Sequence, residues 1–133
     1  MKKKRYLLDT SICVFFLRNK YNIENKLISI GHSNCCISEI TVAELMFGAV
    51  WSGCPENIRI TQQFCNDIEV VPIYDSLMTY ARLKTSLRQQ GLSIDDFDLL
   101  IGCCAISNDM ILVTDNEKHF RRLPVKIENW IQR

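Results

Sequence analysis

Short apolar runs typical of buried strands alternate along this chain with longer segments of helical periodicity. The expected strands span 4–8, 35–37, 70–71, 111–113 and 125–127, and the expected helices span 11–17, 23–30, 41–51, 58–65, 75–90 and 93–106. Parallel strands need crossover connections of this kind, usually helices, whereas tight hairpins join antiparallel strands. The alternation therefore predicts an α/β domain of three layers, with a mostly parallel central sheet flanked by helices.

Acidic or amide residues stand where these elements meet. Asp9 follows the first strand, Glu44 lies near the start of the third helix, and Asp98 lies in the first turns of the last helix. Asp115 and Asn116 follow the fourth strand. Because the carboxyl ends of parallel strands share one edge of the sheet, where such folds bind ligands, we expect these residues to meet there.

Carboxylates crowded at one edge repel one another unless a cation neutralises them. Oxygen ligands favour magnesium or manganese, and the absence of His and Cys at these positions argues against zinc and copper. Each acid also has a local explanation. Asp9 fits a helix N-cap, Thr41 and Glu44 fit a capping box, and Asp115 fits a turn. Asp75 and Ser93 are the expected N-caps of the last two helices.

The seven cysteines do not suggest a metal site or a disulfide framework. Their number is odd, they form no C-x-x-C pair, and His32 and His119 lack ligand spacing. Most have apolar neighbours, which indicates small buried side chains in a reducing cytoplasm.

The 133 residues suit one domain spanning 1–133, and a net charge of +1 differs from that of a strongly basic nucleic-acid binder. No apolar run approaches the length of a membrane span, so we expect no membrane partner and a cytoplasmic protein. The basic residues Lys2 to Arg5 are interpreted as the lead-in to the first strand, because Asp9 interrupts the short apolar run that follows.

Four segments together resemble a known family. They are LLDTSI from Leu7, ITVAELMFG from Ile40, IDDFDLLIGCCA from Ile94 and LVTDNEKHF from Leu112. They are similar, in order and spacing, to the four signatures of PIN-domain nucleases, and most closely to the VapC toxins of VapBC toxin–antitoxin systems. The resemblance implies a PIN-like fold over nearly the whole chain.

The resemblance also implies roles for individual residues. Asp9, Glu44 and Asp98 match the three acids that bind the metal and activate water. Ser11, Asp96, Thr114, Asp115 and Asn116 are supporting candidates, and the fourth family position, Asp or Asn, is here Asn116.

The implied activity is metal-dependent endoribonuclease cleavage of structured RNA, often tRNA, by metal-activated water. Mg²⁺ is the expected cofactor, and Mn²⁺ is expected to substitute. The implied partners are a VapB-like antitoxin and a second copy of the chain in a homodimer. Basic residues expected to hold RNA are Arg18, Lys20, Lys84, Arg88, Lys118, Arg121 and Arg122.

Alternatives remain open at this point. One is a catalytically silent PIN module that binds RNA or a protein partner. Another is a phosphoryl-transfer or receiver domain using Asp9 as nucleophile, although no D-x-D-x-T motif or P-loop is present. For the antitoxin, we expect Phe15 or Phe16 to line an apolar groove together with residues 23–30 and Trp51, unless both phenylalanines belong to the core.

Overall fold

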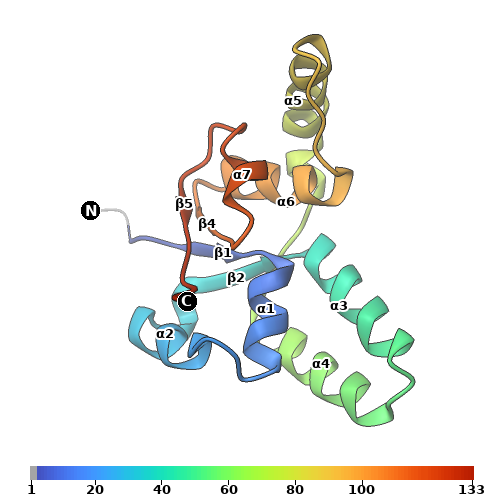
Figure 1. Cartoon of the computed structure of the whole chain (residues 1–133), viewed down its shortest axis with the longest axis vertical. Helices are drawn as coiled ribbons and strands as arrows, with labels where there is room; N and C mark the ends of the chain where they lie inside the picture. Colours follow the sequence, from blue (N-terminus) through green and yellow to red (C-terminus); the bar gives the residue numbers. More distant parts are fainter. Residues whose placement is uncertain (1–2) are drawn as a thin grey trace.

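In the computed structural model of this chain, which describes residues 3–133, five strands form one sheet in the order β3-β2-β1-β4-β5 (Figure 1). The strands are β1 (Tyr6–Leu8), β2 (Cys35–Ser38), β3 (Glu69–Val71), β4 (Ile111–Val113) and β5 (Ile127–Glu128). Every neighbouring pair is parallel, and β1, at the centre, pairs Tyr6 with Cys35 on one side and with Ile111 on the other. The predicted α/β fold with a parallel sheet is therefore confirmed.

Helices connect the strands and cover the sheet. They are α1 (Thr10–Leu17), α2 (Ile23–Ile30), α3 (Glu39–Trp51), α4 (Pro55–Asp67), α5 (Leu77–Gln89), α6 (Asp96–Ser107) and α7 (Glu117–Phe120), with short 3-10 turns η1 (His32–Asn34) and η2 (Tyr74–Ser76). Figure 1 shows α1, α2 and α4 on one side of the sheet and α5, α6 and α7 on the other.

Two hydrophobic clusters bind these layers together. Successive strand residues point to opposite faces, so Leu8 joins the cluster under α1, α2 and α4, while Leu7 joins the cluster under α5, α6 and α7. Both side chains are fully buried. Burial on both faces explains why the strands are continuous apolar runs rather than alternating patterns.

Several predicted caps are wrong. Ser38 caps α3 by accepting a hydrogen bond from Ile40 N at 3.0 Å, so Thr41 lies inside the helix and forms no capping box with Glu44. Asp75 lies in η2 rather than at the N-cap of α5, and the predicted cap Ser93 is replaced by Asp95 at α6. At α3 and α6, Ser38 and Asp95 are better placed to accept from the free backbone N–H groups, whereas α5 begins without a side-chain cap in the described part of the chain.

Other boundaries shifted slightly. The first strand begins at Tyr6, two residues later than expected, the edge strand β5 ends at Glu128, and α7 was not predicted. Lys2, part of the expected lead-in, lies outside the described residues. None of the helices in residues 3–133 combines the length and the hydropathy that a membrane span requires.

The cysteines are free thiols, and all but Cys54 are buried. Burial raises the pKa of Cys36 and of Cys103 to about 12, so both thiols are neutral at physiological pH. Neutral buried thiols behave as small hydrophobic side chains, as predicted.

Candidate active site

Asp9 occupies the centre of the carboxyl edge of the sheet, directly after β1, and is only 5% exposed. Its Oδ1 accepts hydrogen bonds from the Ser11 backbone N at 2.7 Å, from the Ser11 hydroxyl at 2.6 Å and from Ile12 N at 3.4 Å. Its Oδ2 accepts a short bond from the hydroxyl of Thr114, which follows β4. These bonds cap α1 and fix the carboxylate in one orientation.

Glu44 approaches Asp9 from the second turn of α3. Its Oε1 accepts a hydrogen bond from the Thr10 hydroxyl at 2.6 Å, and that hydroxyl lies 3.1 Å from the hydroxyl of buried Thr41. Thr10 was missed by the sequence analysis, although it directly follows Asp9 within the LLDTSI segment. It ties the glutamate on α3 to the first turn of α1.

Asp98 lies in the first turn of α6 and is half-buried. The His119 Nδ1 is 3.6 Å from Asp98 Oδ2, and Asn116 Nδ2 is 2.9 Å from the same nitrogen. Asn116 therefore reaches the cluster through His119, which the sequence analysis set aside because it lacked zinc-ligand spacing. The available signal was its position three residues after Asn116, within reach on a helical turn.

The carboxylates influence one another. Burial is the main cause that raises the pKa of Glu44, and the negative charges of Asp98, Asp95 and Asp9 raise it further, while the Thr10 hydrogen bond opposes the shift. Burial followed by the charge of Asp95 raises the pKa of Asp98, and His119 opposes that shift. The three predicted acids thus share one electrostatic environment.

Asp95 is a fourth acid in this environment that the sequence analysis did not select. Its Oδ2 accepts from Phe97 N at 3.2 Å and from Asp98 N at 3.4 Å, so it caps α6 beside Asp98. Its charge also lies at the positive end of the α6 dipole, where a carboxylate is favourable.

Two supporting candidates lie outside the cluster. Asp96 bonds to Lys84 Nζ at 2.8 Å and to the Tyr80 hydroxyl at 2.9 Å, both on α5. Asp115 forms a two-pronged ion pair with Arg133, at 2.7 and 2.9 Å. Hydrogen bonding to these cations lowers the pKa of Asp96 and of Asp115. Both carboxylates are therefore ionised, and their negative charges are balanced by Lys84 and Arg133.

The donor chemistry of the cluster fits a hard divalent cation, because Asp9, Glu44 and Asp98 supply only oxygen. A cation would also relieve the repulsion that raises the pKa of Glu44 and of Asp98. Within residues 3–133, no three acidic, His or Cys side chains already converge as a closed ligand set. Magnesium tolerates this arrangement, since it keeps several waters and needs few direct protein ligands.

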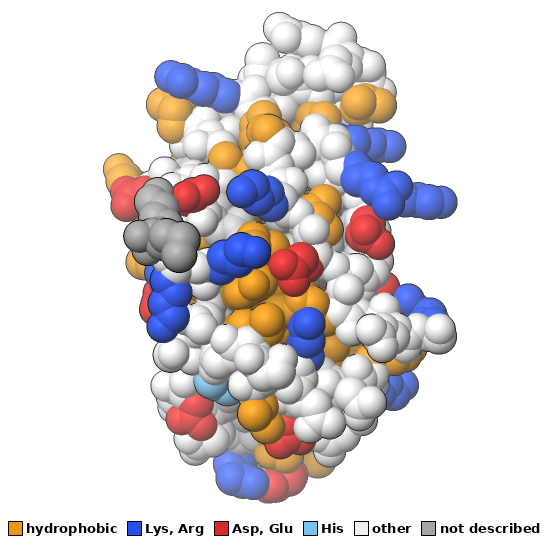
Figure 2. All heavy atoms as spheres, turned by 90° about the vertical axis from the view of Figure 1, so that its left-hand side faces the viewer, with side chains coloured by type: hydrophobic (Ala, Val, Ile, Leu, Met, Phe, Trp, Pro, Cys, Tyr) orange, Lys and Arg blue, Asp and Glu red, His pale blue; other side chains and the backbone are white. Residues whose placement is uncertain are grey.

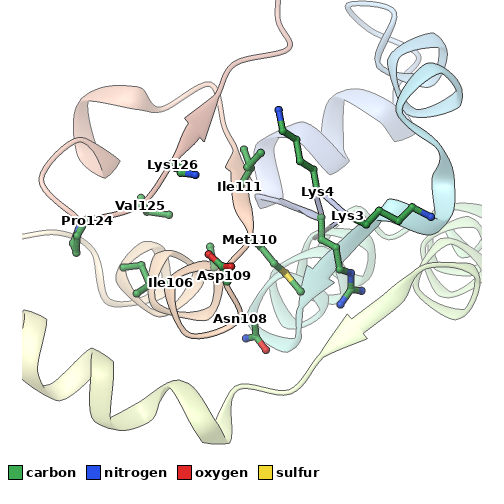
Figure 3. A pocket seen from close by; sticks show the side chains of 12 residues that line it. Lys3, Lys4, Ile106, Asn108, Asp109, Met110, Ile111, Pro124, Val125 and Lys126 are labelled. Carbon is green, nitrogen blue, oxygen red and sulfur yellow. The ribbon is translucent and has the colours of Figure 1, made fainter. Parts of the chain in front are cut away.

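A large cavity lies at the opposite edge of the sheet. It has a volume of about 660 Å³ and opens at the amino ends of β1 and β4. Figure 3 shows Ile106, Met110, Ile111 and Val125 lining it, with Lys3, Lys4 and Lys126 around them. Cavity size alone therefore does not locate the acidic cluster.

The predicted RNA-binding cations are partly engaged within the protein. Lys84 pairs with Asp96, Arg121 lies 3.7 Å from Glu117, and Arg122 donates to the carbonyl of Ser93 at 2.9 Å. Arg18, Lys20, Arg88 and Lys118 are exposed. Figure 2 shows Lys and Arg side chains distributed around a hydrophobic patch on the left-hand side of Figure 1. On this face the positive charges are dispersed rather than gathered in one strip.

The model of the PIN domain matches residues 6–126 of this chain. The chain belongs to the PIN-domain family. Within that family it groups with the VapC ribonucleases. It is 38% identical over 132 residues to ribonuclease VapC2 of Rickettsia felis, with 94% of this chain and 97% of the relative covered. It is 32% identical over 130 residues to the tRNA(fMet)-specific endonuclease VapC of Salmonella typhimurium, with 95% and 98% covered.

Solved structures place the same fold in complexes. The VapBC2 complex of Rickettsia felis bound to a promoter DNA fragment contains a chain with a TM-score of 0.86 and 35% identity, covering 94% of this chain and 98% of that one. A chain of the DNA-bound VapBC of Salmonella typhimurium has a TM-score of 0.88 and 30% identity, and the match covers 96% of this chain and 98% of that one. The resemblance inferred from four short motifs is therefore confirmed for the PIN family and its VapC members.

Proposed function

We propose that this PIN-domain protein is a metal-dependent endoribonuclease that acts as the toxin of a toxin–antitoxin pair. The observation that carries the proposal is the shared electrostatic environment of Asp9, Glu44 and Asp98 at the carboxyl edge of the sheet. Mutually repelling, half-buried carboxylates destabilise a fold, so a chain that keeps them there gains from a bound cation.

Each acid has a distinct part in this proposal. Asp9 and Asp98 hold Mg²⁺, or Mn²⁺ in its place, and Asp9 is the most rigidly fixed of the three. Glu44 has a raised pKa, which makes it the better proton acceptor. Its Oε1 is bound to Thr10, while within residues 3–133 no group donates to Oε2, so Oε2 is the atom that takes a proton from the attacking water.

Mg²⁺ supplies two effects when bound: it acidifies water and neutralises charge on the scissile phosphate. Ser11 and Thr114 orient Asp9, and His119, which also contacts Asn116, lies beside Asp98. A tRNA substrate is proposed because a relative is named for tRNA(fMet) cleavage.

The proposed partner is a VapB-like antitoxin, since similar chains are found in VapBC complexes. An apolar groove runs from Glu44 between α1, α3 and α4, and a second hollow continues it across Leu17 and Ile60. Phe16 lines this groove, whereas Phe15 packs edge-on against Tyr21 with ring centroids 4.9 Å apart. Neither phenylalanine is exposed, and residues 23–30 line neither hollow, so the expected groove lies further toward α4.

A cleavage assay with two aspartate variants tests the proposal. The protein is incubated with total tRNA in Mg²⁺, in excess chelator, and in Mn²⁺ or Zn²⁺ added back. We expect cleavage in Mg²⁺ and Mn²⁺, little in Zn²⁺ and none in chelator. Asp98→Asn should reduce the rate at least about 100-fold, because the cation is weakened.

Asp96→Asn is the matched control on the same helix. Its carboxylate turns to Lys84 and Tyr80, so we expect the rate to stay close to that of the unaltered protein. Undiminished cleavage in chelator, or by Asp98→Asn, would show that the metal cluster is not the active site. Absence of any RNA cleavage would favour a silent RNA- or partner-binding module.

A further inference from the structure

A polar cavity opens beside the acidic cluster, where β5 ends. Its volume is about 490 Å³, and it lies between α2 and the segment that follows β5. Asn129 lines it and also donates to Asp115 and Glu117, at 3.2 Å each. The carbonyl of Glu128, a lining residue, accepts a hydrogen bond from Thr114 N at 3.0 Å, and the Thr114 hydroxyl donates to Asp9, so Thr114 connects the cavity wall to the acidic cluster.

Side-chain amides dominate the lining of this cavity. Asn22, Asn25 and Gln132 form no side-chain hydrogen bond with any group in residues 3–133, so their donors and acceptors are available to a ligand. Paired amide donors and acceptors match the edges of nucleobases. The one acid in the lining, Glu128, already accepts from Trp130 Nε1 at 3.0 Å.

A single cation completes the lining. Lys26 on α2 lies over the ring of Trp130 at 5.9 Å from the centroid and makes no ion pair within the part of the chain that the structure describes. The ammonium of a lysine in this position can contact an RNA phosphate, and the free amides next to it can contact the adjoining base.

The wall of the cavity is held in a costly backbone conformation. Tyr21 and Asn22 have φ values of 58° and 56°, which is unusual for a bulky residue such as tyrosine. Phe15 packs edge-on against Tyr21, and the Arg133 guanidinium lies over the tyrosine ring, 5.3 Å from its centroid. Contacts that retain such strain produce a pre-organised wall, as binding sites require.

We propose that this cavity binds one nucleotide of the RNA substrate near the scissile bond, with Asn25 and Gln132 reading the base edge and Lys26 contacting a phosphate. The proposal rests on the proposed ribonuclease function and adds the origin of its sequence preference. The volume lies in the range of small-ligand sites. A polar lining of this kind does not suit the apolar face of a partner helix, for which the groove beside Leu17 and Ile60 is better matched.

Cleavage of a pool of short RNAs with random sequence tests the proposal. Sequencing the product ends gives the base preference at each position around the cut, for the unaltered protein and for the Asn25→Ala/Gln132→Ala double variant. We expect the double variant to lose preference at one position and to cut the preferred RNA about tenfold more slowly, the loss typical of one base-edge contact. Lys26→Gln should weaken the binding of all RNA sequences to a similar extent, without changing the base preference.

Gln90→Ala is the matched amide control, because Gln90 follows α5, far along the chain from this cavity and absent from its lining. Circular dichroism checks that each variant is folded. An unchanged preference and rate in the double variant would overturn the proposal. Loss of antitoxin affinity with unchanged RNA preference would also overturn it and assign the cavity to the protein partner.

Binding of the same RNAs in excess chelator, where no cleavage is expected, separates the two levels of the proposal. If the unaltered protein cuts no RNA but binds these RNAs with a preference that the double variant loses, the nuclease function fails and the nucleotide site stands. If the unaltered protein binds them without preference, the nucleotide site fails.

Discussion

At the residue scale, one carboxylate combines two roles that the sequence offered as alternatives. Asp9 is the N-cap of α1, as its local explanation predicted, and it also lies at the centre of the acidic cluster. The cap bonds fix the carboxylate, and a fixed carboxylate is a better metal ligand than a mobile one. A local structural role therefore does not count against a functional role at the same residue.

The Thr114 hydroxyl should be needed for both stability and activity. Thr114→Val removes the hydrogen bond to Asp9 Oδ2 inside the protein and should lower the free energy of unfolding by about 1–3 kcal/mol, with reduced RNA cleavage. Urea denaturation measures the first effect. Thr114→Ser keeps the hydroxyl and should retain most of the cleavage rate; an equal loss in both variants would point to packing instead.

Removal of one clustered carboxylate should stabilise the metal-free protein. The pKa of Asp98 is raised in the fold, so its ionised form destabilises the protein at pH 7. Asp98→Asn should raise the free energy of unfolding in chelator by about 0.5 kcal/mol, a figure discounted for solvent screening. The gain should be full above the raised pKa and disappear as the pH falls toward the ordinary value of 3.8.

Thermal unfolding in chelator at several pH values checks this expectation. Asp75→Asn, which removes a carboxylate outside the cluster, should leave the stability nearly unchanged at every pH. A destabilised Asp98→Asn protein at pH 7 would show that its pairing with His119 outweighs the repulsion.

At the element scale, the position of α6 depends on Gly102, which has no side chain. A Cβ at Gly102 would lie 2.6 Å from Leu123 Cδ1 and 3.4 Å from the Phe120 ring. Gly102 therefore lets α6 approach α7 and Leu123 closely, and α6 and α7 carry Asp98 and His119. The distance between these two elements sets the contact of the histidine with the cluster.

A pair of glycine substitutions tests this packing. Gly102→Ala should lower the free energy of unfolding by about 1–3 kcal/mol through overpacking, despite the better helix propensity of alanine. Gly48→Ala in α3, where no atom lies within 4 Å of the added Cβ, should raise it by up to about 1 kcal/mol. Chemical denaturation measures the free energy of unfolding of both proteins. A stabilised Gly102→Ala protein would mean that the Leu123 side chain moves aside at no energetic cost.

At the scale of the whole molecule, the apolar groove beside Glu44 is the proposed binding site of the antitoxin. Ile60→Ser, in the lining that the two hollows share, should weaken antitoxin binding at least about tenfold and leave RNA cleavage intact. Ile28→Ser is the matched control, since Ile28 is 70% exposed on α2 and lines neither hollow. Isothermal titration with the antitoxin measures both, and equal affinities would place the antitoxin elsewhere.

The sequence by itself determined the fold class and the positions of the key acids. Periodicity and the breaker residues are local signals, so the strands at Leu7 and Leu112 and the helices α1 and α6 were predicted within two or three residues, whereas the four-residue helix α7 was not predicted. Asp9, Glu44 and Asp98 were selected as candidate site residues because each lies at a junction of elements and within a family motif.

Only the tertiary structure decided which neighbours each acid has. Thr10, His119 and Asp95 act on the cluster across contacts between different elements, and no spacing along the chain encodes such contacts. In the sequence, Asp96 and Asp115 looked equivalent to their neighbours. In the structure, Asp96 pairs with Lys84 and Asp115 pairs with Arg133, so neither belongs to the cluster. The physical reason is that local pattern sets the conformation of each element, whereas the partners of a charge depend on how distant elements pack.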